Sequence, residues 1–253
     1  KQVDIDIPEL RHDIHWLDMS SGQRKSYDHA EATGITGIRD MKGEATRIHI
    51  LALITKLKLI CNYDDESGQS CKLEFLADRV DEIVDSGEKA LVFSQYPQKT
   101  VPKIETEMRS FNPLRFDGSL STGERDRVVE QFQDEDENDL LLMSVRAGGV
   151  GITLTRANHV FHFDHWWNPA VIDQASARVH RIGQKRAVFI HSLYTVGTIE
   201  ERIANLLEGK RQLFEEMFGD MTDKDVSGKL TDEDLFGLFG LEPPKQTEKD
   251  NTP

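Results

Sequence analysis

The sequence contains no long apolar run and very little cysteine. None of its 253 residues belongs to an apolar stretch that approaches the about 20 residues needed by a membrane-spanning helix. The two cysteines, Cys61 and Cys71, are too few for a disulfide framework, and their spacing fits no zinc motif. We therefore expect an intracellular protein with no membrane partner. The chain starts at Lys1 without an apolar leader, which we interpret as a processed or truncated fragment.

Basic residues are outnumbered by acidic ones. The chain has 31 Lys and Arg against 45 Asp and Glu, a net charge of −14, which over the whole chain argues against a nucleic-acid partner. Between Leu140 and Ile199, however, six basic residues accompany only two acidic ones. Because salt limits the reach of exposed charges to about 8 to 10 Å, a local basic face can bind phosphate on an acidic molecule. The net charge therefore does not exclude DNA, although chance explains the local excess of basic residues equally well.

Two motifs of a complete nucleotide hydrolase are absent from the sequence. Gly228 and Lys229 are followed by Leu230, and they lack the earlier glycine of a GxxxxGK[ST] phosphate-binding loop. The acidic pairs at 81–82 and 134–135 do not continue into a DExH motif. Phosphoryl transfer needs a phosphate cradle and a magnesium ligand. We therefore expect the chain alone to be inactive as an ATPase.

What the sequence does contain is an alternation of strands and helices. Short runs rich in apolar residues predict strands buried on both faces, at residues 90–94, 140–144, 159–164 and 188–193. Other segments have the spacing of amphipathic helices, at residues 73–86, 99–111, 123–133 and 170–181. This order predicts the α/β class, with a doubly wound parallel sheet and helices on both faces, over residues 71–196.

The segments on either side of this core differ from it. Residues 1–70 lead into the core and carry a strongly apolar helix at 48–60, which must pack on another element. Residues 197–240 contain two further amphipathic helices. Residues 241–253 have nothing to bury, and we expect them to form a disordered tail.

The strongest candidate for chemistry is DQASARVHRIGQ, at residues 173–184. Arg178 and Arg181 are three residues apart, so near a helix end both guanidinium groups project to the same side, with Gln174 one turn earlier. Two permanent cations with planar donor groups suit the stabilisation of charge on a transferring γ-phosphoryl group. The spacing alone also fits a surface pair, or a pair held in structural salt bridges.

Three other segments are candidates for contact with phosphate or nucleic acid. Glycines in SVRAGGVGIT (144–153) let backbone amides approach an anion, although a turn without a ligand fits equally well. In FDHWWNPA (163–170), two tryptophans would stack on nucleic acid if exposed or join the core if buried. RFDGSLSTGER (115–125) is a glycine turn before a capped helix, whose free amides could receive a phosphate.

Together these motifs resemble one family closely. The resemblance is to the second RecA-like lobe of the Swi/Snf-family ATP-dependent DNA translocases, chromatin-remodelling helicases of superfamily two. It is carried by LVFSQY (91–96), FDGSLSTGERDRVVEQF (116–132), SVRAGGVGITLTRANHVFHFDHWWNPA (144–170) and DQASARVHRIGQ. LALITKLKLICN before the sheet is similar to the helices that lead into this lobe. TVGTIEERIANLLEGKRQLFEEMF resembles the C-terminal helix that braces the two lobes.

The resemblance implies roles for individual residues. Arg178 and Arg181 match the arginine fingers that reach the ATP phosphates. The positions that match ATP-binding residues are Gln174, Gly149 and Gly151. The positions that match DNA-contacting residues are Ser94, Gln95, Gly118, Ser119, Ser144, Arg146, Trp167 and Asn168. One departure is Ala177, where the family usually has an acidic residue beside the first arginine.

The resemblance implies the C-terminal lobe of a DNA-dependent ATPase that translocates on double-stranded DNA and remodels DNA-protein complexes. ATP with Mg²⁺ would be bound mainly by an N-terminal RecA-like lobe of the same full-length protein, while this lobe supplies arginine fingers and DNA-backbone contacts. We expect the chain itself to be a monomer, in a bacterial cytoplasm or nucleoid or in a nucleus. The alternatives are a non-catalytic RecA-like binding module and lobe two of an RNA helicase.

Two patterns suggest a metal ion, but we predict none. Residues 223–234 have the spacing of an EF-hand loop, but position twelve is Asp234 rather than a bidentate Glu, and no second loop pairs with it. His159, His162 and His165 are close in sequence, but on a strand His159 and His162 face opposite sides. Calcium stays a minor alternative for the first pattern.

Overall fold

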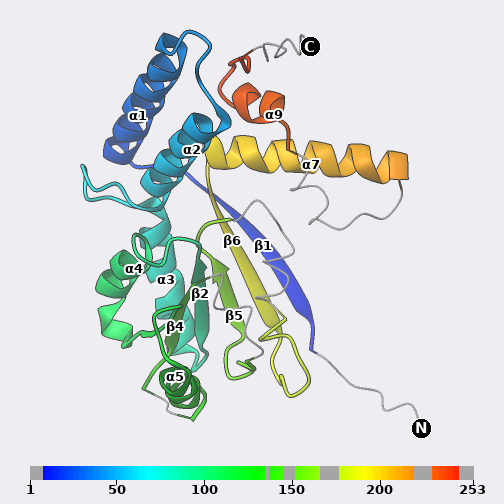
Figure 1. Cartoon of the computed structure of the whole chain (residues 1–253). Coiled ribbons are helices and arrows are strands. Elements are labelled where there is room, and N and C mark those ends of the chain that lie inside the picture. Colours follow the sequence, from blue (N-terminus) through cyan, green and yellow to red (C-terminus); the bar gives the residue numbers. More distant parts are fainter. Residues whose placement is uncertain (1–7, 135–136, 145–151, 166–176, 219–229, 245–253) are drawn as a thin grey trace.

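A computed structural model describes residues 8–134, 137–144, 152–165, 177–218 and 230–244, without the side chains of residues 211–218. Within these residues one 6-stranded, all-parallel sheet has the strand order β1-β6-β5-β2-β4-β3 (Figure 1). The strands are β1 (Leu10–Leu17), β2 (Ala90–Ser94), β3 (Leu114–Phe116), β4 (Leu140–Ser144), β5 (His159–His162) and β6 (Val188–Thr195). The predicted α/β class with a parallel sheet is confirmed.

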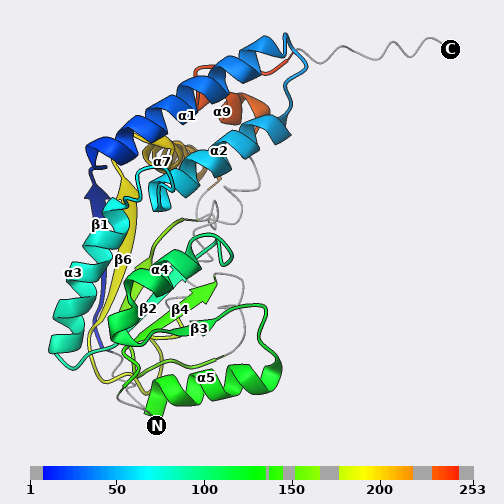
Figure 2. The same ribbon diagram turned by 90° about the vertical axis from the view of Figure 1, so that its left-hand side faces the viewer.

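Helices pack on both faces of the central strands. α3 (Cys71–Asp85) and α4 (Val101–Glu107) pack on one face, and α5 (Thr122–Asp134) packs on the other (Figure 2). Every residue of β2 and β4 is buried, as expected for central strands of a parallel sheet. A 3-10 turn, η1 (Arg109–Phe111), follows α4, so the predicted helix over 99–111 is divided in two.

The described residues form four further helices, in a layer above the carboxyl ends of β1 and β6 (Figures 1 and 2). They are α1 (Ser21–Asp40), α2 (Arg47–Asn62), α7 (Ile199–Phe218) and α9 (Asp232–Gly237). Their inward side chains form a core of their own, in which the buried Tyr27 hydroxyl accepts a hydrogen bond from the Ile199 amide at 2.7 Å. We call these four helices the helical layer. Along the described chain, no helix combines the length and apolar character needed to cross a membrane.

Strand β1 is an element that the sequence pattern does not predict. It pairs in parallel with β6 along its whole length, with Leu10 opposite Val188 and Leu17 opposite Thr195. Most of its side chains are exposed, so it lacks the continuous apolar run that marks a buried strand. β3 is not predicted either, because it has only 3 residues. The sheet therefore includes a strand from the segment that leads into the predicted core.

The predicted helix over residues 170–181 ends differently from the prediction. Its last part, residues 177–181, consists of turn and bend conformations. Gln184 donates to the carbonyl oxygens of Ala157 at 2.8 Å and Val179 at 3.3 Å, and its Oε1 accepts from the next two backbone amides at 2.9 Å. The Val179 carbonyl, which a helix would pair with an amide four residues later, is thus bonded to a side chain, and the Arg178 carbonyl accepts from the Leu154 amide at 3.0 Å. These bonds to groups outside a helix favour a turn here.

Three histidines from neighbouring strands form a hydrogen-bonded chain on the sheet face that α3 covers. His15 of β1 contacts His191 of β6 at 3.1 Å, and His191 contacts His159 of β5 at 3.1 Å. The chain ends where His159 Nε2 contacts Glu88 Oε2 at 2.8 Å. His162 lies on the opposite face of β5, as the alternation along a strand predicts. The chain joins the edge strand β1 to the centre of the sheet.

We expect this histidine chain to make stability fall as the pH drops below about 6.5. Burial and the neighbouring histidines lower the pKa of His191 to about 3. The unfolded chain therefore binds a proton at His191 near pH 6.5, whereas the folded chain keeps His191 neutral until about pH 3, so stability is lost as the pH falls between these values. From about pH 7 to about pH 5 this loss amounts to about 2 kcal/mol in the free energy of unfolding.

Urea unfolding at the two pH values measures the effect, with His191→Phe as the comparison. The phenylalanine variant cannot bind a proton at this position, so its stability should change less with pH than that of the unaltered chain. An equal pH dependence in both proteins would contradict the assignment to His191.

Candidate functional site

The carboxyl ends of β2 and β5 meet at the buried carboxylate of Asp164. Its Oδ2 accepts hydrogen bonds from Ser94 Oγ at 2.5 Å and Asn62 Nδ2 at 2.8 Å. Its Oδ1 accepts from the Gln95 backbone amide at 2.8 Å. Asp164 is only 1% exposed, and a carboxylate so deeply buried needs donors around it. These bonds fix the segments that leave β2 and β5 relative to each other and to α2.

Two buried lysines hold the peptide groups on either side of Asp164. Lys58 of α2 donates to the carbonyl oxygen of His165, which also accepts from Gln95 Nε2 at 3.0 Å. Lys72 of α3 donates to the carbonyl oxygen of Phe163 at 2.9 Å. We call the set that converges here the strand-end cluster; its members are Lys58, Asn62, Lys72, Ser94, Gln95 and Asp164.

A buried ion pair links this cluster to α7. Lys72 Nζ lies 2.7 Å from Glu200 Oε1, and both side chains are almost fully buried. Glu200 also accepts hydrogen bonds from the Thr195 amide at 3.1 Å and the Thr195 hydroxyl at 2.5 Å. Burial acts to lower the pKa of Lys72, but the attraction of Glu200 outweighs it and the pKa is raised. For Lys58 burial dominates, and the pKa is lowered.

Three of the predicted DNA-contacting residues lie at the carboxyl ends of the central strands; they are Ser94, Gln95 and Ser144. Ser94 has no exposed surface, and its hydroxyl donates to Asp164. Ser144, the last residue of β4, is 4% exposed. Gln95 is half-buried. Of these three residues, Gln95 therefore offers the most surface to a ligand.

The loop after β3 carries the predicted pair Gly118 and Ser119, both exposed. Asp117 accepts hydrogen bonds from the amide and hydroxyl of Ser119 at 2.8 and 2.5 Å and pairs with Arg115 at 2.6 Å. Burial acts to raise the pKa of Asp117, but these donors lower it. A side chain added at Gly118 would meet nothing within 4 Å, so the backbone there is open to an approaching ligand.

The two predicted arginine fingers lie on residues 177–183, before β6, which we call the arginine turn. Arg178 is half-buried, and Arg181 is exposed. The Arg181 guanidinium donates to Thr153 Oγ1 at 3.4 Å. His180, between the two arginines, hydrogen-bonds the backbone carbonyl of Pro8 at 2.7 Å. The turn is thus attached to the segment before β1, while the Arg181 side chain stays at the surface.

The arginine turn and the strand-end cluster form two separate groups among the described residues. The turn precedes the first residue of β6, whereas the cluster includes the last residue of β2 and the segment after β5. Parallel strands place these at opposite ends of the sheet. The predicted site residues that lie outside the described part of the chain are Arg146, Gly149, Gly151, Trp167, Asn168 and Gln174.

Four residues of the strand-end cluster were not predicted as site residues, namely Lys58, Asn62, Lys72 and Asp164. Two signals in the sequence point to them. Asp164 ends the predicted buried strand at 159–164, and ligands of open α/β sheets bind outside the carboxyl ends of strands. Lys58 interrupts the apolar helix at 48–60, where a buried ammonium group must find a partner.

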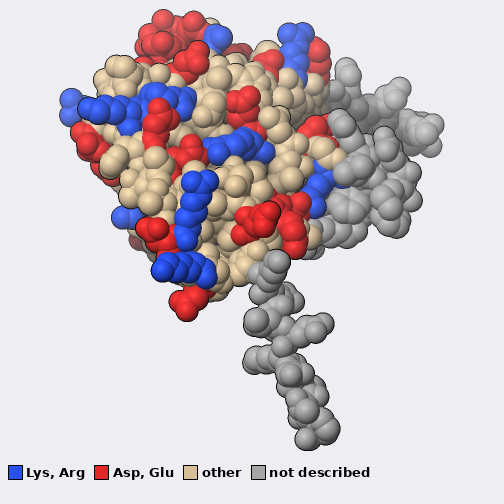
Figure 3. Space-filling model, turned by 90° about the horizontal axis from the view of Figure 1, so that it is seen from above, with Lys and Arg blue, Asp and Glu red and all other residues tan. Residues whose placement is uncertain are grey.

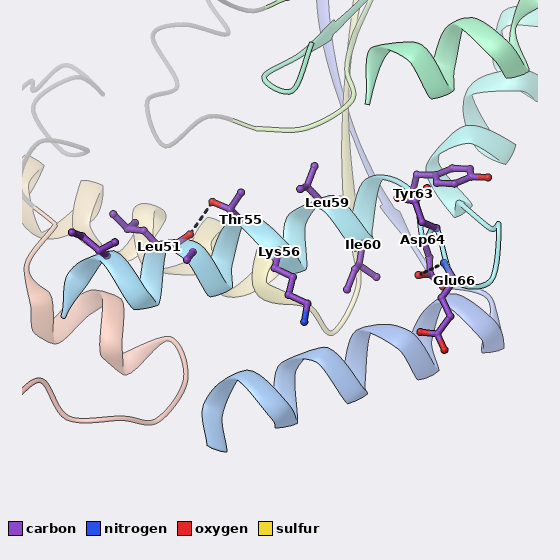
Figure 4. A pocket seen from close by; sticks show the side chains of 11 residues that line it. Leu51, Thr55, Lys56, Leu59, Ile60, Tyr63, Asp64 and Glu66 are labelled. Carbon is purple, nitrogen blue, oxygen red and sulfur yellow. Dashed lines mark hydrogen bonds between the residues drawn. The ribbon is translucent and has the colours of Figure 1, made fainter. Parts of the chain in front are cut away.

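A hollow of about 780 Å³ runs along the outward face of α2 (Figure 4). Leu51, Thr55, Leu59 and Tyr63 are among the residues that line it, and the Thr55 hydroxyl is turned back to the Leu51 carbonyl at 2.8 Å. The hollow contains none of the predicted site residues, and it lies apart from the arginine turn. It therefore gives no support to a nucleotide site on α2.

Asp234, the described end of the segment with EF-hand spacing, has a structural role. Asp234 Oδ2 accepts from the Thr231 amide at 2.7 Å and lies 2.6 Å from Lys210 Nζ, so it caps α9. Within the ranges that the structure describes, no group of three or more His, Cys, Asp or Glu side chains is arranged to hold a metal ion.

Comparison with known sequences finds helicases. Residues 71–183 match the family of the helicase conserved C-terminal domain. YwqA of Bacillus subtilis (strain 168), named as an ATP-dependent helicase/translocase, is 35% identical over 253 residues, which cover 95% of this chain and 27% of that protein. The chain thus spans about a quarter of the length of this relative.

Comparison with solved structures agrees. The SWI2/SNF2 ATPase C-terminal domain of Sulfolobus solfataricus is 27% identical with a TM-score of 0.68, over 92% of this chain and 100% of that one. The SWI2/SNF2 ATPase core of the same organism, in complex with dsDNA, is 29% identical with a TM-score of 0.70, over 93% of this chain and 51% of that one. The chain therefore corresponds to the whole of that C-terminal domain and to about half of the ATPase core.

Proposed function

Since this chain belongs to the Swi2/Snf2 family of ATP-dependent helicases as a C-terminal lobe, we propose that it supplies arginine fingers and DNA-backbone contacts to an ATPase that translocates on double-stranded DNA. The observation that carries the proposal is the arginine turn, which presents Arg181 at the surface beside the half-buried Arg178. A second RecA-like lobe would complete the active site, because this sequence contains no phosphate-binding loop.

The arginine turn has the properties that an arginine finger needs. Such a finger must place a cation against the γ-phosphoryl group while its backbone stays anchored. The Gln184 and His180 hydrogen bonds anchor the turn, and the long 3.4 Å contact of Arg181 with Thr153 can be exchanged for a phosphate oxygen. ATP and Mg²⁺ supply the reacting phosphate and its charge neutralisation, and their ligands would come mainly from the other lobe.

The carboxyl ends of the strands are the better candidate for the DNA contacts. Gly118 and Ser119 are exposed there, and Gln95 is half-buried. The helical layer is less suitable, because Lys and Arg are interspersed with Asp and Glu over the face seen in Figure 3. Contacts to backbone phosphates carry little sequence information. We therefore propose movement along duplex DNA and remodelling of DNA-protein complexes without strong sequence preference, by a monomeric lobe in the cytoplasm, nucleoid or nucleus.

Binding of labelled duplex DNA to the chain tests the DNA part of this proposal. If the lobe contacts about three phosphates, the affinity should fall about 40-fold between about 50 and about 200 mM salt. Fluorescence anisotropy should give the same constants for two unrelated duplex sequences. Tighter binding of RNA than of DNA would instead support lobe two of an RNA helicase, and binding of neither would support a non-catalytic protein-binding module.

A further inference from the structure

We propose that Lys58 of α2 is a positioning residue for the DNA contacts at the carboxyl ends of the strands. Its ammonium group holds the His165 carbonyl after β5, and this carbonyl holds the Gln95 side chain in place for a DNA phosphate. The inference deepens the proposed function and rests on it, because positioning for DNA presupposes that DNA binds at the strand ends.

Gln95 is attached at two points to the same short segment. Its backbone amide donates to Asp164 at 2.8 Å, and its side-chain amide donates to the His165 carbonyl oxygen at 3.0 Å. The Lys58 ammonium group donates to that same carbonyl oxygen. Lys58 therefore fixes the acceptor that orients the Gln95 side chain, although Lys58 itself has almost no surface that a ligand could touch.

Stability does not explain a lysine at this position. Lys58 is 4% exposed within an apolar helix, between the buried Leu57 and the half-buried Leu59. Desolvation of its ammonium group is strong enough to lower its pKa, despite the attraction of Asp164 and Glu200 and with the nearby Lys72 adding to the effect. An apolar side chain of similar length usually does as well or better in such a place. A specific task for the ammonium group is therefore the better explanation.

α2 reaches the strand ends with two side chains. Lys58 and Asn62 are four residues apart, so they lie on one face of the helix. Asn62 donates to the side-chain carboxylate of Asp164, and Lys58 donates to the backbone carbonyl oxygen of His165. The two bonds connect positions 102 and 107 residues apart in sequence. The helical layer thus holds the segment after β5, at the carboxyl ends of the central strands, through one face of α2.

Lys89 provides a matched control for the buried charge. It is 2% exposed, and like Lys58 it donates to backbone carbonyl oxygens, those of Phe132 at 3.1 Å and Asn138 at 2.9 Å. It immediately precedes β2, however, and so lies at the amino end of the sheet, away from Gln95. Loss of its ammonium group should disturb packing near the amino end of β2 without disturbing Gln95 and the proposed DNA contacts at the carboxyl ends of the strands.

The experiment compares two single variants of this chain, Lys58→Met and Lys89→Met. Affinity for labelled duplex DNA is measured over a range of salt concentrations, together with the stability of each variant. Lys58→Met should bind DNA about tenfold more weakly at every salt concentration, because the contacting groups are less well preorganised. The slope of affinity against salt should not change, because no phosphate contact is removed. Lys89→Met should bind within about twofold of the unaltered chain.

Three results would overturn the inference. Unchanged DNA affinity in Lys58→Met would show that the ammonium group does not position Gln95 for DNA. A smaller salt slope would show that Lys58 contacts a phosphate itself. Equal weakening in both variants would show a general loss of packing. A failure of the unaltered chain to bind DNA would instead overturn the proposed function, and the inference with it.

If Lys58→Met does not fold, the positioning role can be tested without DNA by amide hydrogen exchange in a milder variant. Lys58→Gln keeps a hydrogen-bond donor one atom shorter, and amide hydrogen exchange follows the Gln95 backbone amide directly. We expect faster exchange at Gln95 in Lys58→Gln and unchanged exchange there in Lys89→Met, because opening of the segment is local. Equal exchange at Gln95 in all three proteins would overturn the positioning role.

Discussion

Replacement of Arg181 by alanine is expected to lower DNA-stimulated ATP hydrolysis about a thousandfold or more in a protein that contains both lobes. Arginine fingers act by placing a cation where charge develops on the transferred phosphoryl group. Arg181 is exposed on an anchored turn, so its loss should remove this cation and leave the fold intact. Steady-state phosphate release at saturating ATP and DNA measures the effect, and DNA affinity should not change.

Two comparison variants sharpen this prediction. Arg181→Lys keeps the charge but loses the planar fork, so it should recover only part of the activity. Arg186→Ala removes another exposed arginine, which hydrogen-bonds the Gly87 carbonyl at 3.0 Å and pairs with Glu88 at 3.4 Å, and it should retain full activity. Activity of Arg181→Ala within tenfold of the unaltered protein would show that this arginine is structural.

Lys72→Met is expected to destabilise the chain by about 3 to 5 kcal/mol. The Lys72 and Glu200 side chains are 0% and 2% exposed and lie 2.7 Å apart. Removal of the lysine leaves the carboxylate of Glu200 buried without its cation, and an uncompensated buried charge is far more destabilising than the loss of a surface pair. Urea unfolding of the chain at neutral pH measures the change in the free energy of unfolding.

Two further variants separate burial from pairing. Lys72→Met combined with Glu200→Gln removes both charges, so it should recover part of the lost stability. Lys103→Met breaks an exposed pair with Asp65 that also has a short distance, 2.6 Å, and should change stability by less than about 1 kcal/mol. If Lys72→Met were no more destabilising than Lys103→Met, the buried pair would not hold α3 to α7.

The central strands were predictable because burial on both faces leaves a strong signal. β2 and β4 coincide with the predicted runs, and β5 and β6 begin where the runs begin. β1 gave no such signal, because it lies at the sheet edge and mixes Arg, His and Asp with apolar residues. Its place in the sheet depends on pairing with β6, about 180 residues away in sequence, which no local pattern encodes.

The two parts of the candidate site differ in the same way. The arginine turn was found because Arg178 and Arg181 belong to one short motif. Of the strand-end cluster, the motifs gave Ser94 and Gln95 but not Lys58 and Asn62, which meet their partners across more than a hundred residues. The burial of Ser94 also depends on Asp164, a partner 70 residues away. The motif thus marked Ser94 as a predicted DNA-contacting position but gave no sign that its hydroxyl is already bonded.

We propose that this lobe supplies only part of an ATPase active site, and the most direct test is ATP hydrolysis by the separate and the combined lobes. Phosphate release is measured with duplex DNA for this chain alone, for a RecA-like lobe that carries the phosphate-binding loop, and for the two joined in one protein. We expect no turnover by either lobe alone and DNA-stimulated turnover by the joined protein, which Arg181→Ala should lower about a thousandfold or more. Turnover by this chain alone, or a joined protein that stays inert with duplex DNA, would contradict this proposal.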